Sequence, residues 1–176
     1  MADLIVRKAE KGDFERVMDF YRSMTVRMKE KGFVITWVKD VHPSPAFVKE
    51  AIEEGSLYMG LLEGRVVSAM VLNHSHAPQY DKVRWALDLK DRDFFVIHAL
   101  GVDPDVAGKG IGSGMIREAV RSAREKGAGA IRLDVLDTNE PAEKLYLRNG
   151  FRYRGEDELC YPNTGRRIFR MYELVL

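Results

Sequence analysis

Four glycines at alternate positions, in the run Gly108-Lys109-Gly110-Ile111-Gly112-Ser113-Gly114, constrain this 176-residue chain more than any other feature. A strand-like run, residues 94–102, precedes the glycines, and a helix-like run, residues 115–126, follows them. Because glycine lacks a Cβ atom, the backbone can turn sharply there and approach a bulky anion closely. The N-terminus of the following helix adds N–H groups without intrahelical acceptors and the positive end of the helix dipole. Together with the mobile charge of Lys109, this turn predicts a phosphate-binding cradle.

Two common phosphate-binding motifs match the glycine run poorly. A Walker A loop requires Gly-x-x-x-x-Gly-Lys-Ser/Thr, but Lys109 is followed by Gly110, and Asp103 occupies the position of the first glycine. A Rossmann fingerprint requires Gly-x-Gly-x-x-Gly directly after the strand, and residues 102–107 intervene here. Asp134 lies in the next strand-like run, where a ribose-binding acid would be expected, so a dinucleotide site stays open as an alternative.

Composition narrows the class of protein. A net charge of +1 gives no overall attraction to nucleic acid or membrane, and no apolar run approaches the ~20 residues that span a bilayer. The single cysteine, Cys160, cannot form an internal disulfide, which suits a reducing cytoplasm. The N-terminus lacks the apolar stretch of a signal peptide. We therefore expect one cytoplasmic domain over residues 1–176, with neither nucleic acid nor membrane as a partner.

Apolar periodicity and turn residues predict the order β-α-α-β-β-β-α-β-α-β-β, which indicates an α/β fold with a mixed sheet covered by helices. Asp13 and Ser44 are expected to cap the first two helices, and Glu63-Gly64 is expected to form a hairpin turn. Residues 33–37 fit either a strand or an apolar lip over a cleft. The expected strands are 4–7, 56–62, 65–73, 94–102, 130–136, 151–161 and 166–176, and the last two helices are 115–126 and 139–148.

Two stretches outside the glycine run carry titratable side chains. His74 and His76 could seat a metal, but no third ligand follows at a useful spacing, so an exposed loop is favoured and no metal is expected. Residues 83–93 contain Asp88, Asp91 and Asp93. A solvated loop is the main expectation for these acids, and a rim that attracts cations is the alternative.

Three segments in this order resemble the GNAT superfamily of acetyl-CoA-dependent N-acetyltransferases: Leu100-Gly-Val-Asp-Pro104, Gly108-Lys-Gly-Ile-Gly112, and residues 139–151, Asn-Glu-Pro-Ala-Glu-Lys-Leu-Tyr-Leu-Arg-Asn-Gly-Phe. Residues 94–153 carry the specific part of the likeness, and the first ninety residues match only in element order. The resemblance implies a central, mostly antiparallel mixed sheet of six or seven strands with helices on both faces. It also implies acetyl transfer from acetyl-CoA to a primary amine by direct attack in a ternary complex.

By the same resemblance, backbone N–H groups of the glycine turn hold the pyrophosphate of coenzyme A, and a strand segment pairs with the pantetheine arm. Ala107 stands where the family usually has Gln or Arg, whose side chain supports the turn. Asn139 matches a position that commonly contacts the arm or the substrate, and it would also serve as a simple helix cap. The implied cofactor-binding residues are Leu100, Gly101, Val102, Ala107, Gly108, Lys109, Gly110, Ile111, Gly112, Ser113, Asn139 and Tyr146.

The chemistry of acetyl transfer assigns two catalytic candidates. A primary amine with a pKa of ~10.4 is protonated at neutral pH, so a base must remove a proton before it can attack. His98 is the candidate base, since it is the lone titratable group in an apolar strand, where many family members have Glu. Tyr146 matches the tyrosine whose hydroxyl faces the thioester sulfur and is the candidate acid. A backbone N–H at Leu100 or Gly101 is the candidate donor to the oxyanion, and the acids of residues 83–93 are a second choice of base.

No motif identifies the acceptor amine. Its pocket is expected from the first helices, residues 74–93 and the turn near Pro162, where Trp37, Tyr80, Trp85 and Asp88 hint at a cationic, partly apolar amine. Dimerisation is common in the family, so a homodimer is also open. A non-catalytic acetyl-CoA-binding module and a dinucleotide-dependent oxidoreductase are the alternative functions, and the motif at 139–151 counts against the second.

Overall fold

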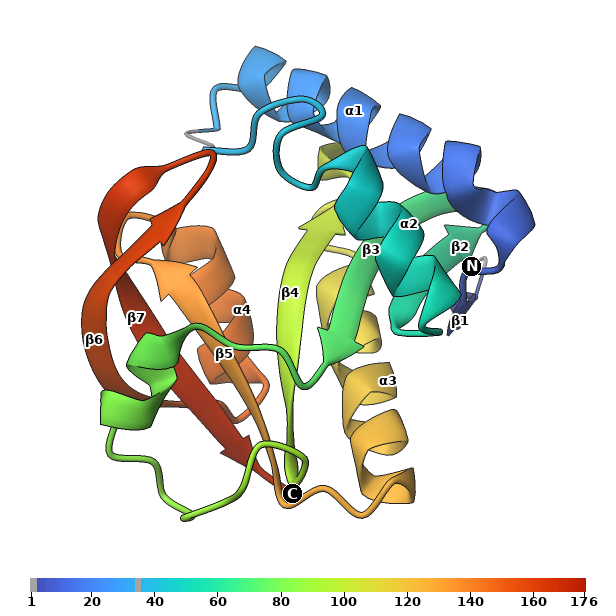
Figure 1. Ribbon diagram of the computed structural model, residues 1–176. Helices are drawn as coiled ribbons and strands as arrows, with labels where there is room; N and C mark the ends of the chain where they lie inside the picture. Colours follow the sequence, from blue (N-terminus) through green and yellow to red (C-terminus); the bar gives the residue numbers. More distant parts are fainter. Residues whose placement is uncertain (1–2, 34–35) are drawn as a thin grey trace. The chain divides into compact units, whose positions relative to one another are not determined.

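The computed structural model describes residues 3–33 and 36–176, and Figure 1 shows its helices and strands. Contacts divide the chain into two compact units. The first unit comprises the chain up to Leu72 together with His98–Met115, and the second comprises Asn73–Ile97 and Ile116–Leu176. A single acetyltransferase domain over residues 1–176 stays a prediction.

The first unit contains antiparallel strands and two helices. Its elements are β1 (Ile5–Lys8), α1 (Phe14–Glu30), α2 (Pro45–Glu53), β2 (Leu57–Leu62) and β3 (Arg65–Asn73). Strand β2 pairs with both β1 and β3. The β2–β3 hairpin turns at Glu63 and Gly64, whose φ angles of 50° and 77° are those of the tight turn that the sequence predicts. Helices α1 and α2 lie side by side (Figure 1) and bury their apolar faces in one hydrophobic core, which includes Val17, Met24 and Val48.

The second unit contains both parallel and antiparallel pairs. Its elements include the 3₁₀-helix η2 (Pro78–Lys82), β5 (Ala130–Leu136), α4 (Glu140–Arg148), β6 (Arg152–Tyr161) and β7 (Gly165–Val175). Strand β7 pairs antiparallel with β5 and with β6. Strand β4 (Phe94–Val102) begins in this unit, where it runs parallel to β5, and ends in the first unit. With seven strands, one parallel pair and otherwise antiparallel pairs among those described, the mixed-sheet prediction and the element order are confirmed.

The helix after the glycine run begins earlier than the sequence suggests. We expected it to span residues 115–126, but α3 covers Ile111–Glu125. The last two glycines of the run therefore form part of the first helical turn. The physical reason is Ile111, which is 5% exposed and packs in a cluster with Val67 and Val106, so tertiary packing outweighs the low helix propensity of glycine.

Ser44 and Asn139 cap their helices as expected, but Asp13 does not. The Ser44 hydroxyl accepts the Phe47 amide at 3.1 Å. The carboxylate of Asp13 instead accepts hydrogen bonds from the side chains of Arg7 (2.7 Å) and Arg16 (2.9 Å) and from the Glu10 amide (3.0 Å). The two arginines compete successfully for the carboxylate because bonds between charged groups are the stronger ones.

The Asp13 cluster predicts a specific loss of stability in acid. Its hydrogen bond with Arg7 is the main cause that holds the pKa of Asp13 at about 2, below the ordinary 3.8. A carboxyl whose pKa is depressed by folding stabilises the protein above its unfolded pKa, and that stability disappears as the pH falls through the folded pKa. Asp13→Asn should therefore lower the free energy of unfolding by roughly 2 kcal/mol at pH 7, and the difference should vanish between about pH 4 and pH 2.

Urea unfolding measured at several pH values tests this prediction. Asp19→Asn is a matched control, because Asp19 is 76% exposed and its carboxylate lies 3.9 Å from Arg22. A difference between wild type and Asp13→Asn that stays constant from pH 7 to pH 2 would contradict the assignment.

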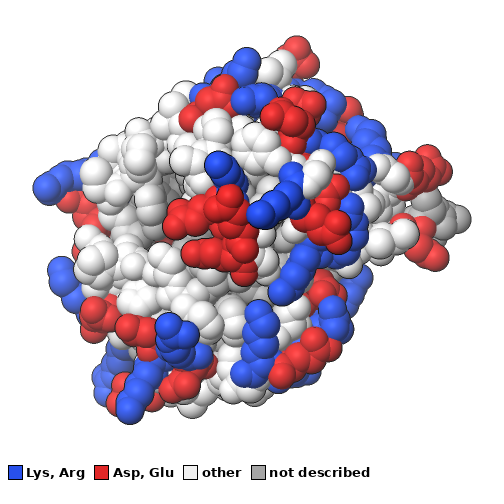
Figure 2. All heavy atoms as spheres, turned by 45° about the vertical axis from the view of Figure 1, so that its right-hand side comes forward, with Lys and Arg blue, Asp and Glu red and all other residues white. Residues whose placement is uncertain are grey.

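No helix in the part of the chain that the structure describes is long and apolar enough to cross a membrane. On the face drawn in Figure 2, basic and acidic side chains are interspersed.

Candidate cofactor-binding and catalytic residues

The glycine turn is an open, exposed bend held at both ends. Residues 107–110 are exposed, whereas Val106 and Ile111 on either side are buried. Gly108 and Gly110 have φ angles of 80° and 76°, and no atom lies within 4 Å of the position a Cβ would take at either residue. The positive φ angles explain the glycines, since other residues adopt this conformation at a cost.

Helix α3 directs its first amides toward this bend. The Gly114 amide donates to the Gly110 carbonyl at 2.9 Å, which closes the first turn of the helix. Amides that precede such a bond have no intrahelical acceptor and carry the positive end of the dipole. An exposed bend with free space, positive φ and a helix N-terminus fits a diphosphate, so the residues predicted to hold coenzyme A suit that group.

Asp103 anchors the approach to the glycine turn. Its side chain is fully buried and accepts hydrogen bonds from Arg27 at 3.1 Å and Arg65 at 2.9 Å. The same side chain accepts the Asp105 amide at 3.0 Å, and its own amide donates to the Val67 carbonyl at 2.8 Å. The sequence marked Asp103 as a mismatch to the Walker motif and as part of the segment Leu100-Gly-Val-Asp-Pro104, but assigned its side chain no role. A buried acid followed by proline, just before a glycine turn, is the signal that could have identified this anchor.

Strand β4 is distorted beside His98. Ala99 has a φ of 49°, an uncommon angle for a residue other than glycine, and its carbonyl accepts the hydroxyl of Tyr21 at 2.9 Å. Local strain of this kind costs about 1–3 kcal/mol and persists only where surrounding contacts enforce it. His98 itself is partly buried. The distortion separates His98 from Leu100–Val102, the segment predicted to pair with pantetheine, and the sequence contained no signal for it.

An aromatic cluster packs against this segment in the first unit. A Cβ at Gly101 would lie 2.7 Å from the Met24 sulfur and 3.2 Å from Trp37, so a larger residue there would require these side chains to shift. The Trp37 ring lies 5.8 Å from Tyr21 and meets the His42 ring edge-on at 5.4 Å. Burial lowers the pKa of His42, which favours the neutral ring. Of the predicted lip at residues 33–37, residues 34–35 lie outside the described residues, and Trp37 is packed against β4.

Tyr146 and Asn139 lie in the second unit, on and before α4. The Asn139 side chain accepts the Ala142 amide at 3.3 Å, which confirms its role as a helix cap. Tyr146 is 7% exposed, and its ring meets Phe151 edge-on at 5.5 Å. Burial, and to a smaller extent the charge of Asp134, raise the pKa of Tyr146. Its hydroxyl therefore keeps its proton at neutral pH, as a general acid must.

Asp134 is a titratable group that sequence reasoning misread. Its carboxylate accepts hydrogen bonds from the hydroxyls of Tyr80 at 2.9 Å and Tyr161 at 3.1 Å. Burial raises the pKa of Asp134, and the two hydroxyl bonds partly oppose this shift. The carboxylate considered as a ribose ligand is thus engaged by two tyrosines. The sequence did contain a signal for this buried carboxylate, since Asp134 lies between apolar residues of a strand.

The histidines of the loop after β3 contact other residues of the second unit. His74 Nδ1 lies 2.6 Å from the Phe94 carbonyl, and His76 Nε2 lies 3.4 Å from the Asp91 carboxylate. Within residues 3–33 and 36–176, no group of three or more His, Cys, Asp or Glu side chains is arranged to hold a metal ion.

Comparison with known proteins identifies the family. The model of the acetyltransferase (GNAT) family matches residues 16–151. Streptothricin acetyltransferase from Streptomyces lavendulae is 43% identical over 68 residues, which cover 39% of this chain and 36% of that protein. The aligned part of this chain spans about a third of the length of three curated relatives: 36% of streptothricin acetyltransferase, and 30% and 32% of two others.

Solved structures share the fold. A GNAT-family acetyltransferase from Listeria monocytogenes superposes with a TM-score of 0.75 at 23% identity, covering 100% of this chain and 98% of that one. An acetyltransferase from Salmonella typhimurium, solved with its cofactor acetyl-CoA, superposes with a TM-score of 0.67 at 16% identity over 98% and 94% of the two chains. The family model matches most of this chain, and the solved structures share its fold. This chain therefore belongs to the acetyltransferase (GNAT) family.

Proposed function

We propose that the protein is an N-acetyltransferase that moves an acetyl group from acetyl-CoA to a primary amine. Family membership supports the reaction class. The observation that carries the proposal is the exposed bend at Gly108 and Gly110, where positive φ angles, free space and the start of α3 coincide. Their coincidence at the start of a helix supports the binding of a diphosphate, since an open glycine turn elsewhere, such as Gly127, is not followed by the start of a helix.

The chain's own residues supply binding and proton handling. Acetyl-CoA, when bound, supplies the activated acetyl thioester. Amides of residues 108–113 hold its pyrophosphate, Leu100–Val102 pair with its pantetheine arm, and Asn139 lies at the family's contact position. The amide of Leu100 or Gly101 donates to the acetyl carbonyl oxygen, where negative charge develops. Tyr146 gives its phenolic proton to the departing sulfur.

Besides the acids of residues 83–93, which the sequence offered as a second choice, two single residues are candidates for removing the proton of the amine. His98, the base proposed from the sequence, can accept a proton on its imidazole near neutral pH. Asp134 is the second candidate, since a carboxylate whose pKa is raised by burial is a stronger base than an exposed one. We propose His98 as the base, with Asp134 as the alternative, and variants of the two residues distinguish between them. We also propose that the protein forms a homodimer, as is common in the family, and that it is cytoplasmic. Light scattering measures the oligomeric state.

The decisive experiment follows thiol release from acetyl-CoA in the presence of a panel of amines. Release that depends on the amine is expected and identifies the enzyme. Binding of acetyl-CoA without amine-dependent release would instead indicate a non-catalytic module. Binding of a nicotinamide dinucleotide in place of acetyl-CoA would indicate the oxidoreductase.

A glycine variant links this activity to the cradle. Gly110→Ala should raise the dissociation constant of acetyl-CoA about tenfold, because binding must restore a left-handed conformation that costs alanine ~1–2 kcal/mol. Gly127→Ala is the matched control, since Gly127 has a φ of 75° and equally open surroundings but lies after α3. An equal effect of both variants on acetyl-CoA binding would contradict the cradle.

A further inference from the structure

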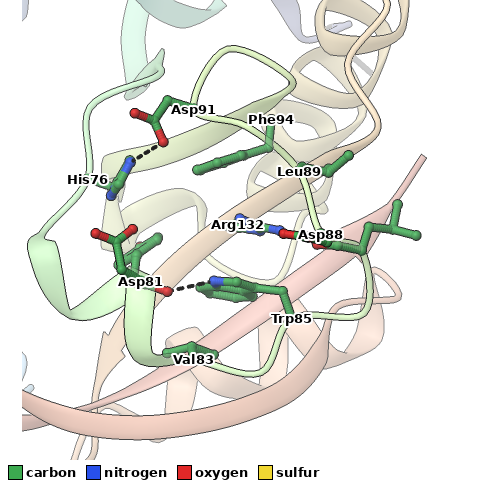
Figure 3. Close-up of a pocket in the computed structure, with 11 residues that line it drawn as sticks. His76, Asp81, Val83, Trp85, Asp88, Leu89, Asp91, Phe94 and Arg132 are labelled. Carbon is green, nitrogen blue, oxygen red and sulfur yellow. Dashed lines mark hydrogen bonds and ion pairs between the residues drawn. The ribbon is translucent and has the colours of Figure 1, made fainter.

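A pocket of about 240 Å³ lies in the second unit, beneath the loop between β3 and β4. Figure 3 shows its residues, which come from this loop, from the start of β4 and from β5. It is smaller than the ~300–1,000 Å³ typical of sites for drug-sized ligands, so it suits a small molecule. None of the cofactor-binding residues assigned above lines it.

Arg132 forms a fixed inner wall of this pocket. Its guanidinium lies between two aromatic rings, with centroids 4.3 Å away at Trp85 and 4.0 Å away at Phe94. Its Nε donates to the fully buried Glu173 carboxylate at 3.1 Å, and its Nη2 donates to the Leu87 carbonyl at 2.8 Å. Glu173 compensates part of the positive charge of Arg132, because the same carboxylate also accepts a hydrogen bond from Arg154 at 3.1 Å.

Three carboxylates surround the opening. Asp91 lies 3.4 Å from His76, which is charged only when protonated. Asp81 and Asp88 also line the pocket, and the charge of Asp88 acts on Arg132 in the inner wall. Figure 3 shows Asp81 and Asp91 on one side of the pocket and Asp88 on the other. Because three acidic side chains gather around it, this opening attracts cations and repels anions.

The arrangement of these acids distinguishes between kinds of cation. A metal ion requires several oxygen ligands converging at ~2.0–2.6 Å, and the described residues hold no group of three acids or histidines close enough to do so. Charges spread around an opening with aromatic walls instead match an organic cation, whose apolar part contacts Trp85 and whose charged group reaches a carboxylate.

We propose that this pocket is a binding site for a small organic cation carrying a guanidinium or alkylammonium group. The pocket includes Tyr80, Trp85 and Asp88, which the sequence suggested for the acceptor amine, but the inference concerns binding of the cation alone and does not require acetyl transfer. Two of its acids, Asp88 and Asp91, belong to residues 83–93, for which the sequence left a cation-attracting rim as the alternative; Asp93 of that rim does not line the pocket.

The Trp85 indole provides the reporter for the test. Its N–H donates to the Tyr80 carbonyl at 2.8 Å inside the pocket wall, whereas the protein's other tryptophan, Trp37, lies in the first unit and serves as internal control. n-Butylguanidinium, titrated into the full chain without acetyl-CoA, should shift the Trp85 indole N–H resonance saturably, with a dissociation constant of about 1 mM or tighter. The Trp37 signal should not move, and neutral 1-butanol should produce no saturable shift.

Charge variants complete the test. Asp81→Asn combined with Asp88→Asn should weaken binding about tenfold, since two carboxylates at the opening lose their charge, and Asp19→Asn on α1 should leave binding unchanged. An unshifted Trp85 signal, equal binding of 1-butanol, or equal affinity of the double variant would overturn the proposal. The binding titration contains no acetyl-CoA, so a negative result there would not contradict the proposed acetyltransferase function. Likewise, the absence of amine-dependent thiol release would not contradict the proposed cation site.

Discussion

Tyr146→Phe is expected to lower the turnover number about 10²-fold while changing the dissociation constant of acetyl-CoA far less. The variant removes one hydroxyl and keeps the buried ring that packs on Phe151. A thiolate with a pKa near 8.5 leaves more easily when an acid protonates it, and the hydroxyl of Tyr146 is protonated at neutral pH, since burial raises its pKa further above the ordinary value of 10.0. The loss should therefore fall on the chemical step.

The role of Tyr146 as an acid can be separated from a structural role. An acyl donor with a thiol of low pKa needs little protonation, so the loss caused by Tyr146→Phe should shrink with such a donor. Tyr153→Phe is the matched control, because Tyr153 lies on β6 and is 50% exposed. Unchanged turnover of Tyr146→Phe, or the same loss with every acyl donor, would remove the tyrosine from the mechanism.

Removal of the base is expected to have the second large effect. His98→Ala should lower the rate about 10²–10⁴-fold for an acceptor amine of pKa ~10.4, with the largest loss near neutral pH. The loss should disappear when the acceptor has a low pKa, because such an amine is already unprotonated. A loss of equal size for every acceptor would count against His98.

Asp134→Asn applies the same measurement to the second candidate. If Asp134 is the base, this variant shows the dependence on acceptor pKa, and His98→Ala does not. The tyrosines supply a further readout, since the hydroxyls of Tyr80 and Tyr161 lower the pKa of the carboxyl that they contact. Tyr161→Phe should then raise the pKa of Asp134 and move the acid limb of the pH–rate profile to higher pH, because the carboxylate is lost at higher pH. An unmoved acid limb would exclude Asp134 as the titrating base.

Local sequence was sufficient for the elements and for the glycine turn. Alternation and turn residues predicted the order of helices and strands along the chain and the Glu63-Gly64 hairpin, because these features depend on neighbours in the chain. The helix start at Ile111 was missed, since it depends on packing against Val67, which is distant in sequence.

The sequence alone also placed the chain in its family, through motifs whose spacing reflects local backbone requirements at Gly108, Gly110 and Asn139. Only the tertiary structure showed Asp103 held by Arg27 and Arg65, the bend at Ala99, and Asp134 between two tyrosine hydroxyls. Each of these joins residues from separate elements, and burial and hydrogen bonding between such residues leave no periodic signal in the chain. Titration and strain arise from that environment, so they became visible only in the folded protein.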